Sequence, residues 1–531
     1  MASDANRDAQ RLIDGLEDRL RPLEVAIAEA WWETNTRLSP AAASRRESAE
    51  LERRAVLSEH DTFAAIERAR AADDLDPLVA RQLDVLHDAF VPNQVPEAVR
   101  RRIVELEVAV EGAFNEFRGE IDGRRVDDNE ILAVLRTSDD GAERRAAWEA
   151  SKQVGTAVAG DVRALARARN EAARELGYRD HFDLALATAE LDEDRLFATL
   201  AAVDDATREP FAVWKGELDE ARAARFGCSV DELRPWHLDD PFFQDPPGAA
   251  TGGLDDVFTD ADLEALTLRT YDGLGLDLRA VMGNSDLYAR EGKSQHAFCI
   301  HVDRSGDVRV LCNVRPNARW AETMLHEFGH AAYDRALGDD LPWFLREPAH
   351  ALTTEGVAML FGRLARSREW LGTVVGVPDA DLATLAPRLD EARRAALLVF
   401  ARWVLVMTTF ERDLYADPDA DLDARWWDLV ERFQLVRRPD GRHAPDWAAK
   451  IHLAVAPVYY QNYLYGELVA SQLQAALAAR AGGIVERPDA GRLLDEGVFR
   501  PGASQRWDRL IEAATGEPLS VRHFAGELAR T

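Results

Sequence analysis

Lysine is scarce in this chain, and acidic residues greatly outnumber basic ones. The sequence has 65 basic residues, of which only Lys152, Lys215, Lys293 and Lys450 are lysines, against 95 aspartates and glutamates. The resulting net charge of −30 at pH 7 is repelled by phosphate backbones and by anionic lipid headgroups. The composition therefore argues against nucleic acid and against a membrane surface as partners.

Long apolar runs are absent as well. Residues 1–8 are polar and lack the apolar core of a secretory signal. The most apolar stretch, residues 395–410, contains Arg402 and is shorter than the roughly 20 residues that a membrane span needs. We therefore predict a buried core helix at 395–410, no membrane anchor and a cytoplasmic location.

Cysteine is rare too. With only Cys228, Cys299 and Cys312, the chain has neither a disulfide framework nor the paired spacing of a cysteine zinc site. Reduced thiols are the simplest interpretation. A two-residue turn at Ser305-Gly306 would place Cys299 opposite Cys312, so one bridge between them is the alternative.

Apolar residues recur at helical spacing over residues 5–230, for example Leu12, Leu16 and Leu20. Turn signals such as Thr137-Ser-Asp-Asp-Gly141 separate the predicted helices. This half of the chain is therefore expected to form long amphipathic helices.

Residues 235–253 contain four prolines and three glycines and are predicted to be irregular. They favour a boundary between a helical lobe at 1–240 and a catalytic lobe at 255–531, although an ordinary packed surface loop is the alternative.

The one clear β signal lies at residues 296–302 and 308–314, which predict a hairpin. The fold class is accordingly mostly α.

The sequence His326-Glu327-Phe-Gly-His330 lies in a helical run. Residues four apart share a helix face, so His326 and His330 can present two imidazole nitrogens to one zinc ion. Glu327 is rotated by about 100° from His326, which places its carboxylate beside the metal, where a base acting on water belongs. The flanking residues are apolar, which favours a buried helix over a solvated helix face.

A catalytic zinc site needs a third protein ligand and keeps one position open. Glu355, 25 residues after His330, is the single acidic residue in the apolar segment 352–361. Thr353 or Thr354 can cap a helix there. We predict Glu355 as the third ligand; the alternative is a glutamate that the dipole of its helix merely favours.

Two other carboxylates, Asp334 and Glu347, lie near the motif in the sequence. They are weaker candidates for the third ligand. Both are better suited to supporting the ligand side chains from outside the metal shell.

Further segments resemble known zinc peptidases. Leu341-Pro-Trp-Phe-Leu-Arg-Glu347, followed by Glu355, resembles the angiotensin-converting-enzyme family of peptidyl-dipeptidases. The step from His330 to Glu355 equally resembles the thimet oligopeptidase and oligopeptidase F families. Ala30-Trp-Trp-Glu-Thr-Asn-Thr36 is similar to the opening helix of the converting-enzyme family. These families share one superfamily, so the resemblance implies zinc-dependent hydrolysis of peptides.

The resemblance also assigns a role to His296-Ala297. In the converting-enzyme family this pair lies on an edge strand that binds the substrate backbone, and its histidine holds the substrate near the metal. The predicted hairpin independently places both residues on a strand, where an extended peptide can add as a further strand. The alternative is a core hairpin whose histidine is satisfied by its neighbours.

Lys450-Ile-His452 and Tyr459-Tyr460-Gln-Asn-Tyr463 resemble the segment that completes the active site in this superfamily. The resemblance implies that Tyr463 and His452 donate hydrogen bonds to the oxyanion, and that Lys450 with Tyr460 binds the carboxylate of the substrate. The loop after His452 differs in length from the family's, which leaves Tyr459 and Tyr460 as alternatives for the second tyrosine. Without the resemblance, such a tyrosine cluster is typical of core packing.

We therefore expect a two-lobed helical fold with a deep channel, the hairpin at its floor and one zinc ion per chain. Such a channel admits short, flexible peptides. Lys450 favours release of carboxyl-terminal dipeptides, since a fixed cation suits a free carboxylate. Internal cleavage of oligopeptides is the alternative, and a helical binding protein with a degenerate site is a third. The oligomeric state is left open.

Overall fold

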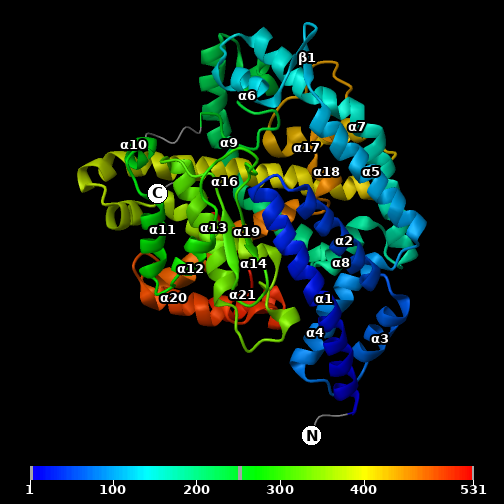
Figure 1. Ribbon diagram of the computed structural model, residues 1–531. Coiled ribbons are helices and arrows are strands. Elements are labelled where there is room, and N and C mark those ends of the chain that lie inside the picture. The colour runs from blue at the N-terminus through cyan, green and yellow to red at the C-terminus, as the bar shows by residue number, and fades with distance from the viewer. Residues whose placement is uncertain (1–3, 249–253, 529–531) are drawn as a thin grey trace. The chain divides into compact units, whose positions relative to one another are not determined.

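The computed structural model describes residues 4–248 and 254–528. Helices make up most of them, and the strands form only two hairpins (Figure 1). The prediction of a mostly α fold is thus confirmed. Among the described helices, none combines the length and the apolar character that crossing a membrane would require.

The chain forms two compact units, each assembled from three separate segments. Unit 1 comprises Met1–Gln94, Thr251–Asp390 and Tyr465–Phe524, and unit 2 comprises Val95–Ala250, Glu391–Leu464 and Ala525–Thr531. Three helices contribute residues to both units: α16 (Asp379–Ala416), α19 (Tyr460–Ala481) and α22 (Val521–Leu528). The predicted lobes at 1–240 and 255–531, and the channel between them, stay predictions.

Unit 1 contains the first helices of the chain, one hairpin and the helix of the histidine motif. Its elements are α1 (Asp4–Thr36), α2 (Pro40–Leu57), α3 (His60–Arg70), α4 (Pro77–Phe90), α10 (Leu254–Phe258), α11 (Leu263–Asp272), α12 (Arg279–Asn284), β3 (Phe298–His301), β4 (Val308–Leu311), α13 (Ala318–Ala336), α14 (Ala351–Gly362), α15 (Arg368–Trp370), α20 (Pro488–Leu494) and α21 (Trp507–Thr515). Asn317 starts α13, because its side chain accepts a hydrogen bond from the N–H of Trp320.

Unit 2 contains α7 (Gly141–Glu175) and α9 (Glu193–Phe226), with 35 and 34 residues the longest helices of the first half of the chain. Its other elements are α5 (Glu97–Glu116), β1 (Gly119–Ile121), β2 (Arg124–Val126), α6 (Asp128–Thr137), α8 (His181–Thr188), α17 (Leu422–Gln434) and α18 (His452–Val455). The predicted turn at 137–141 separates α6 from α7, and Asp140 caps α7 by accepting from the N–H groups of Ala142 and Glu143. Residues 395–410 lie within α16 and are mostly buried, as predicted.

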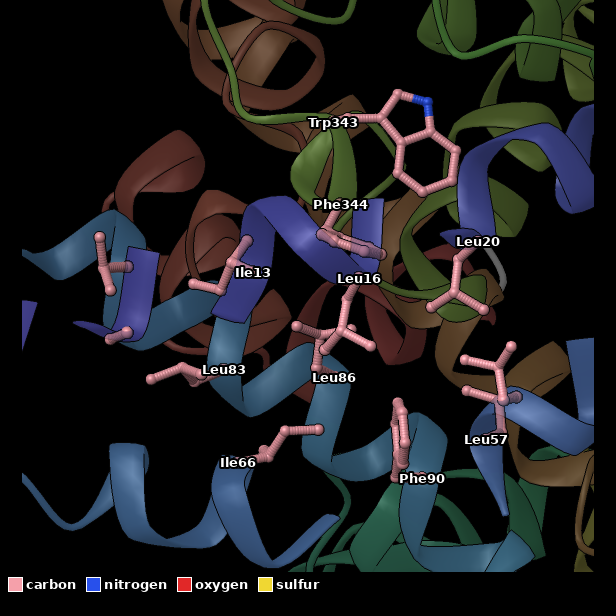
Figure 2. Packing of buried hydrophobic residues seen from close by; sticks show 13 residues of the cluster. Ile13, Leu16, Leu20, Leu57, Ile66, Leu83, Leu86, Phe90, Trp343 and Phe344 are labelled. Carbon is pink, nitrogen blue, oxygen red and sulfur yellow. The ribbon is translucent and has the colours of Figure 1, made fainter. Parts of the chain in front are cut away.

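The first helices of unit 1 share a core with a segment that is distant in sequence. Ile13, Leu16 and Leu20 form one buried face of α1, at spacings of three and four residues. This face packs with residues of α3 and α4 and with Trp343 and Phe344, which belong to a short 3-10 helix (Figure 2). The family-like segment 341–347 is therefore part of the core that anchors α1.

The hairpin of unit 1 forms, and its turn lies between the predicted strand segments 296–302 and 308–314. β3 pairs antiparallel with β4, and His301 lies opposite Val308. Asp303 shapes the turn, because its Oδ1 accepts from the N–H groups of Ser305 at 2.8 Å and Asp307 at 3.0 Å. The turn is consequently longer than two residues, which excludes the alternative of a two-residue turn at Ser305-Gly306.

This register also determines whether Cys299 and Cys312 lie opposite each other. Cys299 pairs with Val310 rather than with Cys312. Cys228, Cys299 and Cys312 are all free thiols. The interpretation as reduced thiols is confirmed, and the alternative bridge is wrong.

The hairpin β1–β2 of unit 2 was not predicted. Ile121 pairs with Arg124, which leaves Asp122 and Gly123 as the two turn residues. Both have positive φ, 51° and 79°, as a tight two-residue hairpin turn requires. Asp-Gly is a strong sequence signal for such a turn, and the sequence analysis overlooked it.

Candidate metal centre

His326, His330 and Glu355 converge within unit 1. The two histidines lie one turn apart on α13, with ring centroids 5.0 Å apart, and Glu355 extends from α14. Its Oε2 lies 3.8 Å from Nε2 of His326 and 4.0 Å from Nε2 of His330. One ligand atom from each residue lies within 4.8 Å of the others, and the described parts of the chain hold no second group of this kind.

Glycines bring the supporting helices unusually close together. A Cβ added to Gly329 of α13 would lie 2.9 Å from Cα of Ala358 on α14. A Cβ added to Gly466 of α19 would lie 3.2 Å from Cβ of Glu355. Because no side chain separates these backbones, α14 lies near enough for Glu355 to reach the two imidazoles.

Thr354 orients one of the imidazoles. Its Oγ1 lies 2.7 Å from Nδ1 of His330. When Nδ1 carries the proton and donates it to Thr354, Nε2 keeps its lone pair for a metal. The predicted cap involves Thr353, whose Oγ1 accepts from the N–H of His350 at 3.1 Å, while the side chain of His350 accepts from the N–H of Leu352 at 3.0 Å.

Burial sets the protonation of the three ligands. It lowers the pKa of His326 to about 4, and burial together with His326 lowers the pKa of His330 to about 3. Neutral imidazoles result, which is the form that binds metal. Burial also raises the pKa of Glu355 to about 7, as expected for a carboxylate without a cation beside it. Two neutral nitrogens and one carboxylate oxygen fit a three-ligand zinc site.

Glu327 lies beside this group. Its side chain is buried, and burial together with the nearby Glu355 raises its pKa to about 8. The backbone N–H of Cys299 donates a hydrogen bond to it and partly opposes that shift. A divalent cation at the ligand group would favour the ionised form of both carboxylates. Glu327 is thus placed to serve as a base, with β3 fixing its carboxylate.

Asp334 and Glu347 do not belong to the ligand group. Asp334 is buried on α13 and accepts a hydrogen bond from Sγ of Cys299 at 3.8 Å, so it supports the residue that contacts Glu327. Glu347 forms an ion pair with Arg304, with an N–O distance of 2.5 Å. That either residue supports the ligand side chains stays a prediction.

His296 and Ala297 precede β3, which begins at Phe298. Their predicted position on the strand itself is therefore wrong by one or two residues, although both lead directly into it. The loop before them is anchored by Lys293, whose buried Nζ donates to the carbonyls of Asp286, Tyr288 and Cys312. Four backbone and side-chain oxygens hold this ammonium.

The end of α1 supports the same loop. The carbonyl of Asn35 accepts from the N–H of Ser294 at 2.8 Å. Trp31 packs on Phe298 with ring centroids 4.3 Å apart, and Trp32 meets the same ring edge-on at 6.1 Å. The tryptophan pair in the family-like segment 30–36 therefore holds the start of β3 in place.

The remaining candidates lie together in unit 2. Nζ of Lys450 donates to Oε1 of Gln244 at 2.8 Å and lies 5.7 Å from the ring centroid of Tyr460. Burial lowers the pKa of Lys450 to about 8, against the raising effect of Asp240. The sequence analysis did not select Gln244, which lies far from Lys450 in the chain.

Aromatic contacts join His452 to the three tyrosines. The ring of His452 lies 5.1 Å from that of Tyr460, and Tyr463 lies 5.9 Å from Tyr460 and 5.2 Å from Tyr459. Burial and the charge of Lys450 lower the pKa of His452 to about 4, so its imidazole is neutral. Tyr460, rather than Tyr459, is the tyrosine that faces Lys450.

Comparison with known families agrees with this arrangement. The family model of angiotensin-converting enzyme, peptidase M2, matches residues 3–203 and 292–523, which is most of the chain. All the site residues predicted from the sequence fall within the second matched segment. No curated protein matches the chain.

Peptidases of this family use zinc, and the three residues that converge on α13 and α14 form a suitable ligand set. The mostly helical fold is consistent with the same assignment. The chain is therefore a zinc metallopeptidase of the angiotensin-converting enzyme family.

Proposed function

We propose that the chain removes dipeptides from the carboxyl termini of short peptides. The observation that carries this proposal is the surroundings of Lys450, a mostly buried cation that Gln244 and Tyr460 border. A fixed ammonium with an amide and a phenol beside it can bind a terminal carboxylate. An enzyme that cleaves within long peptides has no use for such a group.

We assign the metal-binding role to His326, His330 and Glu355. A zinc ion held there supplies a Lewis acid that polarises the peptide carbonyl and makes water nucleophilic at neutral pH. Glu327 accepts the proton of the attacking water molecule and passes it to the nitrogen of the leaving amine. The hydrogen bond from the N–H of Cys299 keeps the Glu327 carboxylate oriented for both transfers.

Tyr463 and His452 stabilise the oxyanion that forms at the attacked carbonyl. Each donates one hydrogen bond, Tyr463 from its hydroxyl and His452 from its neutral imidazole. Neutral donors aimed at developing charge lower the barrier more than they stabilise the bound substrate. The neutral state of His452 supports this role, because its pKa is lowered to about 4.

The substrate backbone binds beside β3. In the described residues β3 pairs with no strand besides β4, so an extended peptide can add along its other edge next to Cys299, whose N–H donates to Glu327. His296 and Ala297, at the start of this strand, contact the residues that flank the scissile bond. Short peptides are therefore the partners that we propose.

A pair of matched substrates tests the proposal. One peptide is offered with a free carboxyl terminus and again with an amidated one, and the products are identified by mass spectrometry. Dipeptide release from the free form alone is expected. Equal cleavage of both forms at internal bonds would instead identify an oligopeptidase.

Lys450→Met is the matching variant. Removing a hydrogen bond to a charged group costs about 1.5–3 kcal/mol. We therefore expect kcat/KM for the peptide with a free carboxyl terminus to fall by roughly 10- to 100-fold. Lys215→Met is the control, since Lys215 is also a buried lysine of unit 2 but pairs with Asp219 at 2.6 Å. Equal losses in the two variants would contradict the role of Lys450.

A further inference from the structure

Two buried ionisable residues of unit 2 hold the segment between His452 and Tyr463. Arg169 belongs to α7 and Glu411 to α16, and their exposed fractions are 3% and 2%. Neither lies in the segment that they contact. Both direct their polar atoms at its backbone rather than at its side chains.

Arg169 binds the end of α18. Its Nη1 donates to the carbonyl of Leu453 at 3.1 Å, and its Nη2 donates to the carbonyl of Ala454 at 2.5 Å. The other hydrogen bonds of these nitrogens go to Tyr415 at 3.0 Å and Glu107 at 2.6 Å, which fix the guanidinium plane. The last carbonyls of a helix lack intrahelical donors, and a planar guanidinium can satisfy two of them at once.

Glu411 binds the other end of the segment. Its Oε1 accepts from the N–H of Val458 at 2.7 Å. Val458 has φ of 52°, a left-handed conformation that is costly for a β-branched side chain. Such a residue costs about 1–3 kcal/mol and persists only where its surroundings impose it. Gln461 adds a second restraint by donating to the carbonyl of Val458 at 2.5 Å.

We propose that Arg169 and Glu411 are positioning residues that set the orientation of His452 and Tyr463 through the backbone between them. This inference rests on the proposed function, which makes those two side chains the oxyanion donors. Arg169 fixes the turn that follows His452, and Glu411 fixes the left-handed backbone of Val458, which directly precedes Tyr459. Oxyanion donors must be held in place in advance, because a displacement of about 1 Å can cost about 100-fold in rate.

The chemistry of Glu411 suits this role at neutral pH. Burial raises its pKa to about 8, while the N–H of Val458 and the charge of Arg169 lower it in part. A protonated carboxyl keeps a carbonyl oxygen that can accept from Val458. Glutamine offers the same oxygen, so Glu411→Gln should preserve the restraint, whereas Glu411→Met removes the acceptor.

Steady-state kinetics on a short peptide with a free carboxyl terminus test the inference. For Glu411→Met we expect kcat to fall about tenfold or more with little change in KM. Glu411→Gln should stay within about twofold of the unaltered protein. Asp204→Leu is the control, because Asp204 is also a buried carboxylate of unit 2 but pairs with Arg402 and Arg208.

Hydrogen exchange provides a readout that does not depend on activity. Amides of residues 453–463 should exchange faster in Glu411→Met than in Glu411→Gln or in Asp204→Leu. If Glu411→Met does not fold, Arg169→Lys answers the same question, because lysine lacks the planar fork that holds two carbonyls.

Unchanged kcat and unchanged exchange in Glu411→Met, even with a lower melting temperature, would overturn the inference. That result would leave Glu411 a purely structural residue. If the unaltered protein hydrolyses no peptide, the proposed function fails instead. Hydrogen exchange would still decide in that case whether Glu411 restrains the segment.

Discussion

Gly329 of α13 lies so close to Ala358 of α14 that a methyl group on the glycine would stand 2.9 Å from the alanine Cα. Carbon atoms in contact prefer about 3.5–4.0 Å. The pair therefore sets the distance between the helix that carries both imidazoles and the helix that carries Glu355. Within the motif, Gly329 thus contributes by lacking a side chain, beside the two histidines and Glu327.

Gly329→Ala should weaken zinc binding by pushing α14 away from α13. We expect a lower zinc content after dialysis against a weak chelator, measured by elemental analysis, together with a stability loss of about 1–3 kcal/mol from overpacking. Gly15→Ala is the control, since a Cβ at Gly15 of α1 meets no atom within 4 Å. An alanine at Gly329 that retains full zinc would contradict the argument.

Thr354→Val should lower zinc affinity by about 10- to 100-fold, because His330 loses the partner of its Nδ1. Valine keeps the branched shape of threonine and removes only the hydroxyl. Thr354→Ser keeps the hydroxyl and should bind zinc almost normally. Competition with a fluorescent chelator measures both affinities. Equal weakening by serine and valine would show that shape, not hydrogen bonding, is what matters at this position.

Glu327→Gln should retain zinc and lose peptide hydrolysis, because glutamine cannot accept the proton of the attacking water. The amide can still receive the hydrogen bond that the N–H of Cys299 donates. Zinc content and hydrolysis of a short peptide are measured on the same preparation. Residual activity near that of the unaltered protein would remove Glu327 from the mechanism.

Glu411 should make stability depend on pH. Burial raises its pKa from 4.5 to about 8, so between these values the folded chain keeps a proton that the unfolded chain releases. Its contribution to stability is complete below pH 4.5 and is lost as the pH rises through 8. As the pH rises from 5 to 8, the free energy of unfolding of Glu411→Gln should therefore increase by at least about 1 kcal/mol relative to that of the unaltered protein.

Urea unfolding at both pH values measures this difference. Asp204→Asn is the control, because burial of Asp204 is outweighed by Arg208 and Arg402, and its pKa is lowered. Asp204 remains ionised in both states above pH 5, so the stability difference of that variant should not change with pH. A constant difference for Glu411→Gln as well would show that its carboxyl is not protonated in the folded chain.

The metal ligands could be predicted because their geometry is mostly local. His326 and His330 share a helix face by spacing alone, and Glu355 stood out as one acid in an apolar helix. A cap was predicted at Thr353 or Thr354 for the same reason, since hydroxyls near helix starts commonly cap them. Thr353 takes part in the cap, but Thr354 has another task. Its true partner, His330, lies on another helix, and helix packing is not encoded in spacing.

Residues with distant partners escaped the sequence analysis. Gln244 meets Lys450 only in the folded chain, and Arg169 and Glu411 are ordinary helix residues until the backbone of 453–458 is placed against them. The exact register of β3 and β4 stayed open in the sequence analysis, because it depends on Asp303, which stabilises the turn through two backbone N–H groups. By contrast, the Asp122-Gly123 hairpin could have been predicted from its turn residues.

The shared core of α1, α3, α4 and residues 343–344 (Figure 2) has a consequence for biosynthesis. The apolar cluster of α1, α3 and α4 is completed by Trp343 and Phe344, which are translated much later than these helices. Until then the nascent chain exposes part of this apolar surface, and such a state is prone to aggregation. Chaperone binding during translation would protect it, and a truncation that ends before Trp343 should accumulate in the insoluble fraction.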